Sequence, residues 1–350
     1  KDFSGLSDPR QAKKVKHQLS AVLLYGLLSF VFQMASRREA NRELSRPTFI
    51  ATLQELFPEL ESFPHADTLH RVLQKLEVSQ LEQAHVALIR RLIRQKKFRR
   101  YLIDHCYPIA IDGTQKLVRQ GQWWDEAWLE RRHKSDQGDV VQQYVYVLEA
   151  NLTFHNGVSL PLLSEFLSHG EGDPDDKKQD CEQRAFHRLA QRLKAYFPRL
   201  PILVLLDGLY PNGPIMARCR QYRWQFMIVL PDKSLASVWQ EIQALQPRVP
   251  HQRHHQPWQG RQQTCWWIND IDYSYGNDHQ HLTIHVVGCE ESWPEIDTDS
   301  GERITKKARH VWLSSQPLKP NNVHARCNLG ARHRWGIETN VLIEKRQGYC

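Results

Sequence analysis

A run of five branched apolar residues that ends in an acid most constrains how this chain can fold. Residues 202–206 read Ile-Leu-Val-Leu-Leu and are followed directly by Asp207 and Gly208. An uninterrupted apolar run of this length predicts a strand buried on both faces, as in the centre of a parallel or mixed sheet. Asp207 then lies where the strand emerges, where a carboxylate needs backbone donors, a cation or a metal ion as its partner.

A second short apolar run ends in the same way. Residues 108–113 read Pro-Ile-Ala-Ile-Asp-Gly, so Asp112 ends a strand predicted at residues 107–112, and residues 113–115 are expected to form a loop beside it. One such strand-Asp-Gly sequence is most simply a turn, but two raise the question of a shared site. Further strands and a helix are predicted between the two runs, at residues 140–152, 158–166 and 181–197. In that order a mixed sheet can bring its first and fourth strands together, and Asp112 close to Asp207.

Composition is that of a globular protein with an anionic partner. The 350 residues suit one large or two ordinary domains, and the net charge of +8 favours nucleic acid without identifying it. The seven cysteines include no Cys-x-x-Cys pair, which argues for a reducing compartment and against a disulfide framework or zinc module. The apolar residues 21–32 are fewer than the roughly 20 that span a bilayer, so residues 19–35 are predicted to form a buried helix.

The chain divides into a helical part and an α/β part. Residues 1–100 carry leucines at helical spacing and predict an all-α region, for which DNA binding and packing on a neighbouring domain are equally open. Residues 101–350 alternate strands and helices, and include a helix predicted at 212–222 and a fifth strand at 224–230. Residues 231–318 interrupt this alternation as a β-rich insertion. Its histidines match no familiar zinc module.

The last predicted helix, residues 321–345, carries a charged stripe. Arg334, Glu338 and Lys345 lie four and seven residues apart and share one face. Apolar residues such as Trp335 and Ile337 on the other faces predict that this helix packs on the sheet. Glu338, between two cations, would then reach inward.

These residues together resemble the DDE transposases of bacterial insertion sequences, in the branch named for its Tyr-Arg-Glu-Lys signature. The resemblance rests on Asp112, Asp207, the β-rich insertion and Arg-x-x-x-Glu-x-x-x-x-x-x-Lys, and covers residues 107–350. The signature's tyrosine, three residues before the arginine, is Ala331 here. That departure places the tyrosine's function in question, while the three acids are retained.

The resemblance implies a ribonuclease-H-like mixed sheet flanked by helices, in a cytoplasmic, nucleoid-associated protein that acts as a homodimer on DNA and not at a membrane. It implies that Asp112, Asp207 and Glu338 are catalytic and hold two Mg²⁺ or Mn²⁺ ions, with Asp112 as the bridging ligand. Arg334 and Lys345 would contact DNA phosphates. Two such ions stabilise the attacking and leaving oxygens of a phosphodiester. Water would free a 3′-hydroxyl at the element end, and that hydroxyl would attack target DNA.

Three other readings stay open. A nuclease on the same fold would cut DNA without joining it, and the carboxylates alone do not separate it from a transposase. A domesticated or truncated relative would only bind DNA, and the start without Met and the end at Cys350 are expected for a segment of a longer protein. A glycosidase built on paired acids ranks last, because it leaves the basic residues of the last helix without a function.

Overall fold

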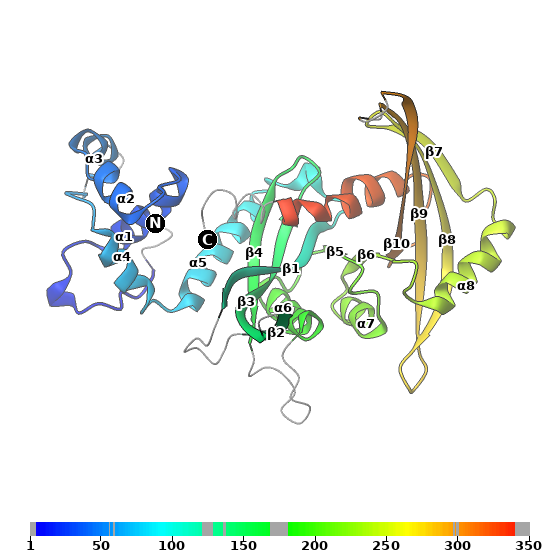
Figure 1. The fold of residues 1–350 in the computed structure, drawn as a ribbon, viewed down its shortest axis with the longest axis horizontal. Coiled ribbons are helices and arrows are strands. Elements are labelled where there is room, and N and C mark those ends of the chain that lie inside the picture. The colour runs from blue at the N-terminus through cyan, green and yellow to red at the C-terminus, as the bar shows by residue number, and fades with distance from the viewer. Residues whose placement is uncertain are drawn as a thin grey trace. The chain divides into compact units, whose positions relative to one another are not determined.

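The computed structural model describes residues 5–55, 57–58, 60–120, 129–135, 138–168, 181–296, 298 and 301–339. The chain divides into two compact units, with the boundary between Lys97 and Phe98 (Figure 1). The second unit runs from Phe98 to Val341 and contains every described strand.

The described part of the first unit is helical, as predicted. Its elements are η1(Ala12–Lys14), α1(Leu19–Val31), α2(Arg37–Leu44), α3(Pro47–Gln54), α4(Ala66–Leu73) and α5(Val78–Arg94). Helix α2 was not predicted, although its start carries a recognisable cap. The Ser36 hydroxyl accepts a hydrogen bond from the amide of Glu39, and the Glu39 carboxylate accepts one from the amide of Ala35.

Helix α1 is buried over only part of its length. Tyr25 is 1% exposed and packs with Leu44 and Phe63, whereas Phe30 and Val31 are more than half exposed. The prediction of a fully buried helix is therefore wrong for its C-terminal half. Among the described residues, no helix has the length and apolar character needed to cross a membrane.

The second unit is built on one mixed sheet of ten strands, which confirms the α/β prediction. The strand order is β2-β3-β1-β5-β6-β10-β9-β8-β7, with β4 paired to β3. The strands are β1(Tyr107–Gln120), β2(Leu129–Ser135), β3(Gly138–Thr153), β4(Ser159–Leu167), β5(Ile202–Leu206), β6(Gln225–Val229), β7(Arg253–Trp258), β8(Arg261–Tyr275), β9(Gln280–Ile296) and β10(Arg303–Ser314). Strand β5 runs parallel to both β1 and β6, and the other pairs are antiparallel.

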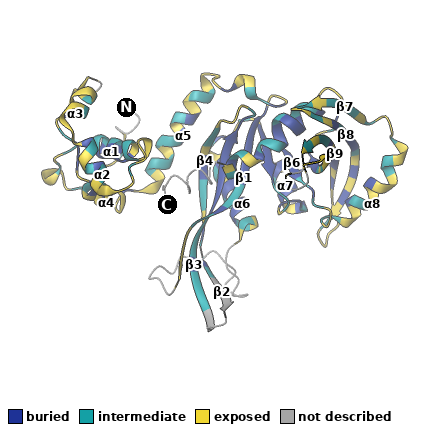
Figure 2. Ribbon diagram, turned by 45° about the horizontal axis from the view of Figure 1, so that its top comes forward, coloured by how far each residue is buried: buried dark blue, intermediate teal, exposed yellow. Residues whose placement is uncertain are grey.

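Strand β5 lies at the centre of the sheet, as its sequence predicts. All five of its residues are at most 1% exposed, and the β1 residues that pair with it and Phe226, Met227 and Ile228 of β6 are also buried (Figure 2). Burying one Leu, Ile or Val side chain contributes about 1.5–3 kcal/mol. The buried strand β5 therefore anchors Asp207, which follows it directly in the chain.

Strand β1 is longer than predicted. It continues past Asp112 to Gln120, because β3 remains hydrogen bonded beside it as far as the pair Gln120 and Gln142. Asp112 therefore lies within a strand and not at its end. The prediction that residues 113–115 form a loop is wrong.

Helices cover the sheet near its centre. Helix α6(Glu182–Tyr196) packs on β3 and β4, and α7(Gly213–Gln221) packs on β6. The Asn212 side chain caps α7 by accepting a hydrogen bond from the amide of Ile215. Both helices lie where the sequence predicted them.

The β-rich insertion is a continuation of the same sheet. Strand β10 pairs with β6 in the register Trp312 to Val229, so β7–β10 extend the sheet beyond the core strands. The sequence predicts insertion strands at residues 264–268, 281–287 and 310–314, and these are confirmed but are longer than expected; β7 and α8(Ala236–Leu245) were not predicted.

The C-terminal segment is helical but irregular. A π-helix, η5(Ala325–Gly330), leads into a 3₁₀-helix, η6(Ala331–Trp335), and one α-helical turn follows, up to Thr339. The predicted single helix over residues 321–345 is therefore wrong in type for its first half. The position of Lys345 lies outside the described residues.

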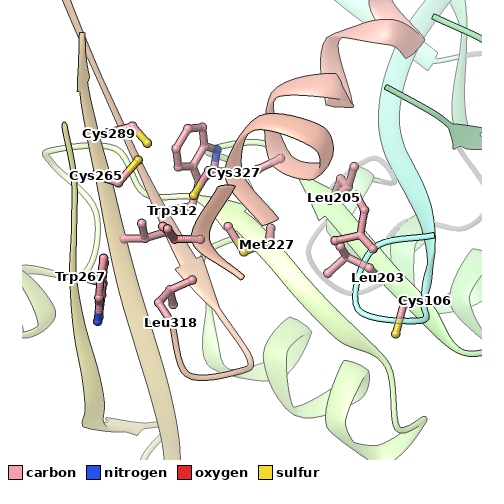
Figure 3. Packing of buried hydrophobic residues seen from close by; sticks show 14 of the residues in the cluster. Cys106, Leu203, Leu205, Met227, Cys265, Trp267, Cys289, Trp312, Leu318 and Cys327 are labelled. Atoms are coloured by element: carbon pink, nitrogen blue, oxygen red, sulfur yellow. The ribbon is translucent and has the colours of Figure 1, made fainter. Parts of the chain in front are cut away.

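A buried apolar cluster joins this segment to the sheet. It includes Leu203 and Leu205 of β5, Met227 of β6 and four cysteines, Cys106 and the neighbouring three Cys265, Cys289 and Cys327 (Figure 3). Cys265 and Cys289 are directly opposite on β8 and β9, and the Cys265 thiol is hydrogen bonded with the thiols of Cys289 and Cys327. This convergence of three cysteines was not apparent from their spacing in the sequence.

Candidate active site

The two aspartates occupy equivalent register positions, Asp112 within β1 and Asp207 directly after the neighbouring parallel strand β5. The register pairs Ala110 of β1 with Leu205 of β5, and Asp112 and Asp207 each follow by two residues. Carboxyl ends of adjacent parallel strands meet at one edge of a sheet, which is where open α/β sheets bind ligands. The sequence prediction that the sheet brings these strands side by side is confirmed.

Each aspartate is also held by its own backbone. The amide of Gly113 donates to Asp112 Oδ1 at 3.0 Å, and the amide of Leu209 donates to Asp207 Oδ1 at 2.9 Å. The second bond is the turn that a strand-Asp-Gly sequence predicts. Asp207 can therefore form this turn and also share a site with Asp112.

Arg334 links Asp112 to Glu338. Its guanidinium lies 3.1 Å from Asp112 Oδ2 and 2.8 Å from Glu338 Oε1. The Arg334 side chain is 8% exposed, and its Nε is buried without a hydrogen-bond partner among the described residues. The predicted stripe of Arg334 and Glu338 thus forms an ion pair that faces β1.

The carboxyl group of Asp112 carries a raised pKa. Burial raises it to about 6, and the negative charges of Asp207 and Glu338 add to this effect, while the Arg334 guanidinium opposes it. A buried acid with acidic neighbours is a feature of functional sites as well as of structural networks. Asp207 and Glu338 therefore both act electrostatically on the Asp112 carboxyl group.

Ala331 occupies the position that the signature gives to tyrosine. It is 5% exposed and belongs to the apolar cluster that contains Leu203 and Leu205. Next to it, a Cβ added at Gly330 would lie 3.1 Å from Ile103 Cδ1. The backbone here lies close against the sheet, which favours a small side chain.

A fourth acid, Glu182, lies close to β1 but on the side of Gly113. The hydroxyls of Tyr146 and Tyr210 both donate to its carboxylate, the second at 2.9 Å. Burial raises the pKa of both tyrosines, and the Glu182 charge raises it further, so both remain hydroxyl donors. Because successive residues of a strand face opposite sides, Glu182 supports the strand from the face opposite Asp112.

Sequence reasoning missed Glu182. It opens helix α6, where an acid is most simply a favourable charge at a helix N-terminus. The two tyrosines that complete the network come from β3 and from the turn after β5, so no local pattern connects them.

The donor chemistry suits a hard cation, but the described arrangement is not that of a metal centre. Carboxylate oxygens are the ligands that Mg²⁺ and Mn²⁺ prefer. Within the part of the chain that the structure describes, no group of three or more His, Cys, Asp or Glu side chains is placed to hold a metal ion. At the acid cluster, Arg334 bonds both Asp112 and Glu338 and so competes for their oxygens.

Fold and site together describe an α/β protein with an electrostatically coupled acid cluster at the edge of a mixed sheet. Residues 1–89 match the family model described as DDE_Tnp_1-associated, and this match supports a DDE-type transposase family. The match covers the helical region and ends before the acids. A search of curated proteins finds no match to the chain.

Proposed function

We propose that this chain is a DNA transposase of the DDE class with a ribonuclease-H-like catalytic unit, in the branch with the Tyr-Arg-Glu-Lys signature. The observation that supports this most is the equivalent register position of Asp112 in β1 and Asp207 directly after β5, with Arg334 connecting Asp112 to Glu338. The family match in residues 1–89 supports the same class independently.

The proposed cofactors are two Mg²⁺ or Mn²⁺ ions held by Asp112, Asp207 and Glu338. When bound, such ions stabilise negative charge on the attacking and leaving oxygens of a phosphodiester. Their binding would require Arg334 to give up its bonds to Asp112 and Glu338. The released guanidinium would then be available to a DNA phosphate, for which its planar donors are well suited. Lys345 is proposed as a second phosphate contact.

The proposed partner is DNA, both the element ends and the target. Cutting two ends in one reaction requires two active sites, so a homodimer on DNA, associated with the nucleoid, is proposed. Basic residues concentrated in the helical unit support contact with a polyanion.

The test is a cleavage and strand-transfer assay with the full-length protein and a plasmid that carries the terminal sequences of its own element. With Mg²⁺ or Mn²⁺, we expect nicks at the element ends and joined products, and neither with EDTA. Asp112→Asn, Asp207→Asn and Glu338→Gln should each lower the rate about 100-fold or more, as loss of one charge-stabilising group does.

The matched control is Asp272→Asn, because Asp272 is a 69% exposed acid on β8, outside the cluster. It should leave the rate unchanged. Cleavage that survives all three cluster substitutions would remove the metal-dependent proposal. Cleavage without joining would favour the nuclease, and binding without cleavage would favour a protein that only binds DNA.

A further inference from the structure

A cavity of about 700 Å³ lies directly beside the acid cluster. Asp207 and Arg334 form part of its wall. The remainder comes from the end of β6, the start of β8, the middle of β10 and the 3₁₀-helix η6. The cavity therefore lies where the β-rich insertion meets the segment that carries Glu338.

Three arginines in this wall are each stacked on a tryptophan. The distances from the guanidinium carbon to the centre of the indole are 4.0 Å for Arg261 on Trp293, 4.7 Å for Arg332 on Trp258 and 5.6 Å for Arg309 on Trp239. Stacking fixes the plane of a guanidinium while its N–H groups remain at the edge of that plane. Such an edge suits two oxygens of a phosphate group.

Buried and exposed carboxylates orient these arginines. Glu291, whose side chain is fully buried, accepts hydrogen bonds from both Arg261 and Arg332, the first at 2.9 Å. Arg309 pairs with Asp232, which is 71% exposed. One carboxylate shared by two arginines leaves positive charge uncompensated, and each guanidinium has five N–H donors.

The rim of the cavity carries an exposed aromatic side chain. Trp335 follows Arg334 directly and is 63% exposed, although its sequence position predicted packing on the sheet. An indole of this exposure can stack a nucleotide base, a contact that does not depend on the base's identity. Phosphate-binding and base-stacking groups therefore share one cavity.

We propose that this cavity binds one strand of DNA, with consecutive phosphates on Arg261, Arg309 and Arg332 and a base on Trp335. The proposal deepens the function proposed above, since the bound strand would lie next to the phosphodiester at the acid cluster. A volume of about 700 Å³ falls in the range of small-ligand sites, which holds a nucleotide or two of a single strand. A duplex would fit only if its strands separate there.

The test measures equilibrium binding of a fluorescent single-stranded oligonucleotide of about ten nucleotides to the full chain, in EDTA, over a series of salt concentrations. No cleavage or metal ion is involved, so this result and that of the strand-transfer assay fail independently. Arg309→Gln is the first variant, because its partner Asp232 is exposed and tolerates the loss. We expect weaker binding and a salt slope smaller by about 0.7, the value for one phosphate contact on a single strand.

A second variant removes a guanidinium without leaving a buried charge unpaired. Arg332→Gln combined with Glu291→Gln should reduce the salt slope by a similar amount. Trp335→Ala should weaken binding about 5- to 100-fold with an unchanged slope, because stacking is lost and no phosphate contact changes.

Arg253→Gln is the matched control, since Arg253 is an exposed arginine of the same insertion on strand β7 and does not line the cavity. It should match the wild-type affinity and slope. Unchanged slopes for both arginine variants would overturn the proposal. An equal loss of affinity for a fully paired duplex would overturn its single-strand part.

Discussion

Among the described acids, Asp112 has a carboxyl pKa that burial raises, so its charge destabilises the folded protein. Its pKa is raised to about 6 by burial and by its acidic neighbours, against an ordinary value of 3.8. The folded state therefore holds this proton more tightly than the unfolded chain. The resulting stability is fully present below about pH 3.8 and is lost as the pH rises through about 6.

Replacing this charge should stabilise the metal-free protein. In EDTA at pH 7, Asp112→Asn is expected to raise the free energy of unfolding of the second unit by about 2–3 kcal/mol, the equivalent of a shift of about two pKa units. Asn keeps an oxygen that can accept from Arg334. Thermal or denaturant unfolding at pH 7 and pH 4 measures the effect, which should shrink at the lower pH. A variant less stable than wild type at pH 7 would contradict this account.

Gly113, next to Asp112, leaves too little room for an added methyl group. A Cβ there would lie 2.6 Å from Glu182 Oε1 and 2.6 Å from the Tyr146 hydroxyl. Gly113→Ala is expected to lower stability by about 1–3 kcal/mol, the usual cost of overpacking. Gly5→Ala, where a Cβ meets nothing within 4 Å, is the control and should change stability by less than about 0.5 kcal/mol. Equal unfolding midpoints for the two variants would refute the tight fit.

At the scale of elements, Arg326 fastens the π-helix to the sheet. Its side chain is fully buried and donates at 2.7 Å to both Asp104, which precedes β1, and Gln225, the first residue of β6. Glu338 lies on the same C-terminal segment. The bonds of Arg326 therefore also help to fix the position of Glu338 relative to the sheet.

Removing the Asp104 charge should loosen that anchor. Asp104→Asn is expected to cost about 2 kcal/mol, less than the 3–5 kcal/mol of a fully buried pair because the Asp104 side chain is 32% exposed. Asp270→Asn is the matched control, since Asp270 also has a positive φ but a 78% exposed side chain. Chemical denaturation of both variants measures the difference, and equal stabilities would show that the Arg326 pair contributes little.

Elements with a strong local pattern could be predicted from the sequence, and others could not. Residues 202–206 form a continuous apolar run, and their buried strand and its parallel neighbour follow from it. Strand β7, Arg-His-His-Gln-Pro-Trp, has few apolar residues, because it is an edge strand with alternate residues exposed. Strand β1 extends beyond its apolar run because β3 is hydrogen bonded beside it. No pattern in the sequence of β1 itself indicates this pairing.

The candidate site likewise has parts that could be predicted from the sequence and parts that could not. The spacing of Arg334 and Glu338 predicts that they share one face, and the repeated strand-Asp-Gly pattern predicts that Asp112 and Asp207 follow neighbouring strands. The Glu182 network depends on residues from three segments of the chain, and the arginine–tryptophan cavity on residues from four or more elements. Long-range pairing of that kind leaves no signal in a single sequence.

At the scale of the whole molecule, positive charge is uneven between the two units. Residues 1–97 contain sixteen lysines and arginines against ten acids, which gives +6 of the chain's net +8. The second unit is thus close to neutral overall, and its basic character is local to sites such as the arginine cavity. Sequence-independent attraction to DNA is therefore expected to come mainly from the helical unit.

The unit boundary should be the preferred site of proteolysis. Lys96 and Lys97 are exposed and follow the end of α5, so brief trypsin treatment is expected to leave a stable fragment that begins near Phe98. Mass spectrometry of the fragments identifies the cut. Arg192, within α6, should remain uncut on the same timescale. A first cut inside the ten-stranded sheet would contradict the two-unit division.

The hydrogen bonds between β10 and β6 position the β-rich insertion relative to the acids. They join the insertion to β6, the strand beside β5, which Asp207 follows directly. A nucleic acid bound along the insertion would therefore be positioned relative to the acids through this strand pairing. If the protein cuts DNA as proposed, the length of the insertion would then help to set the position of the cut along the strand.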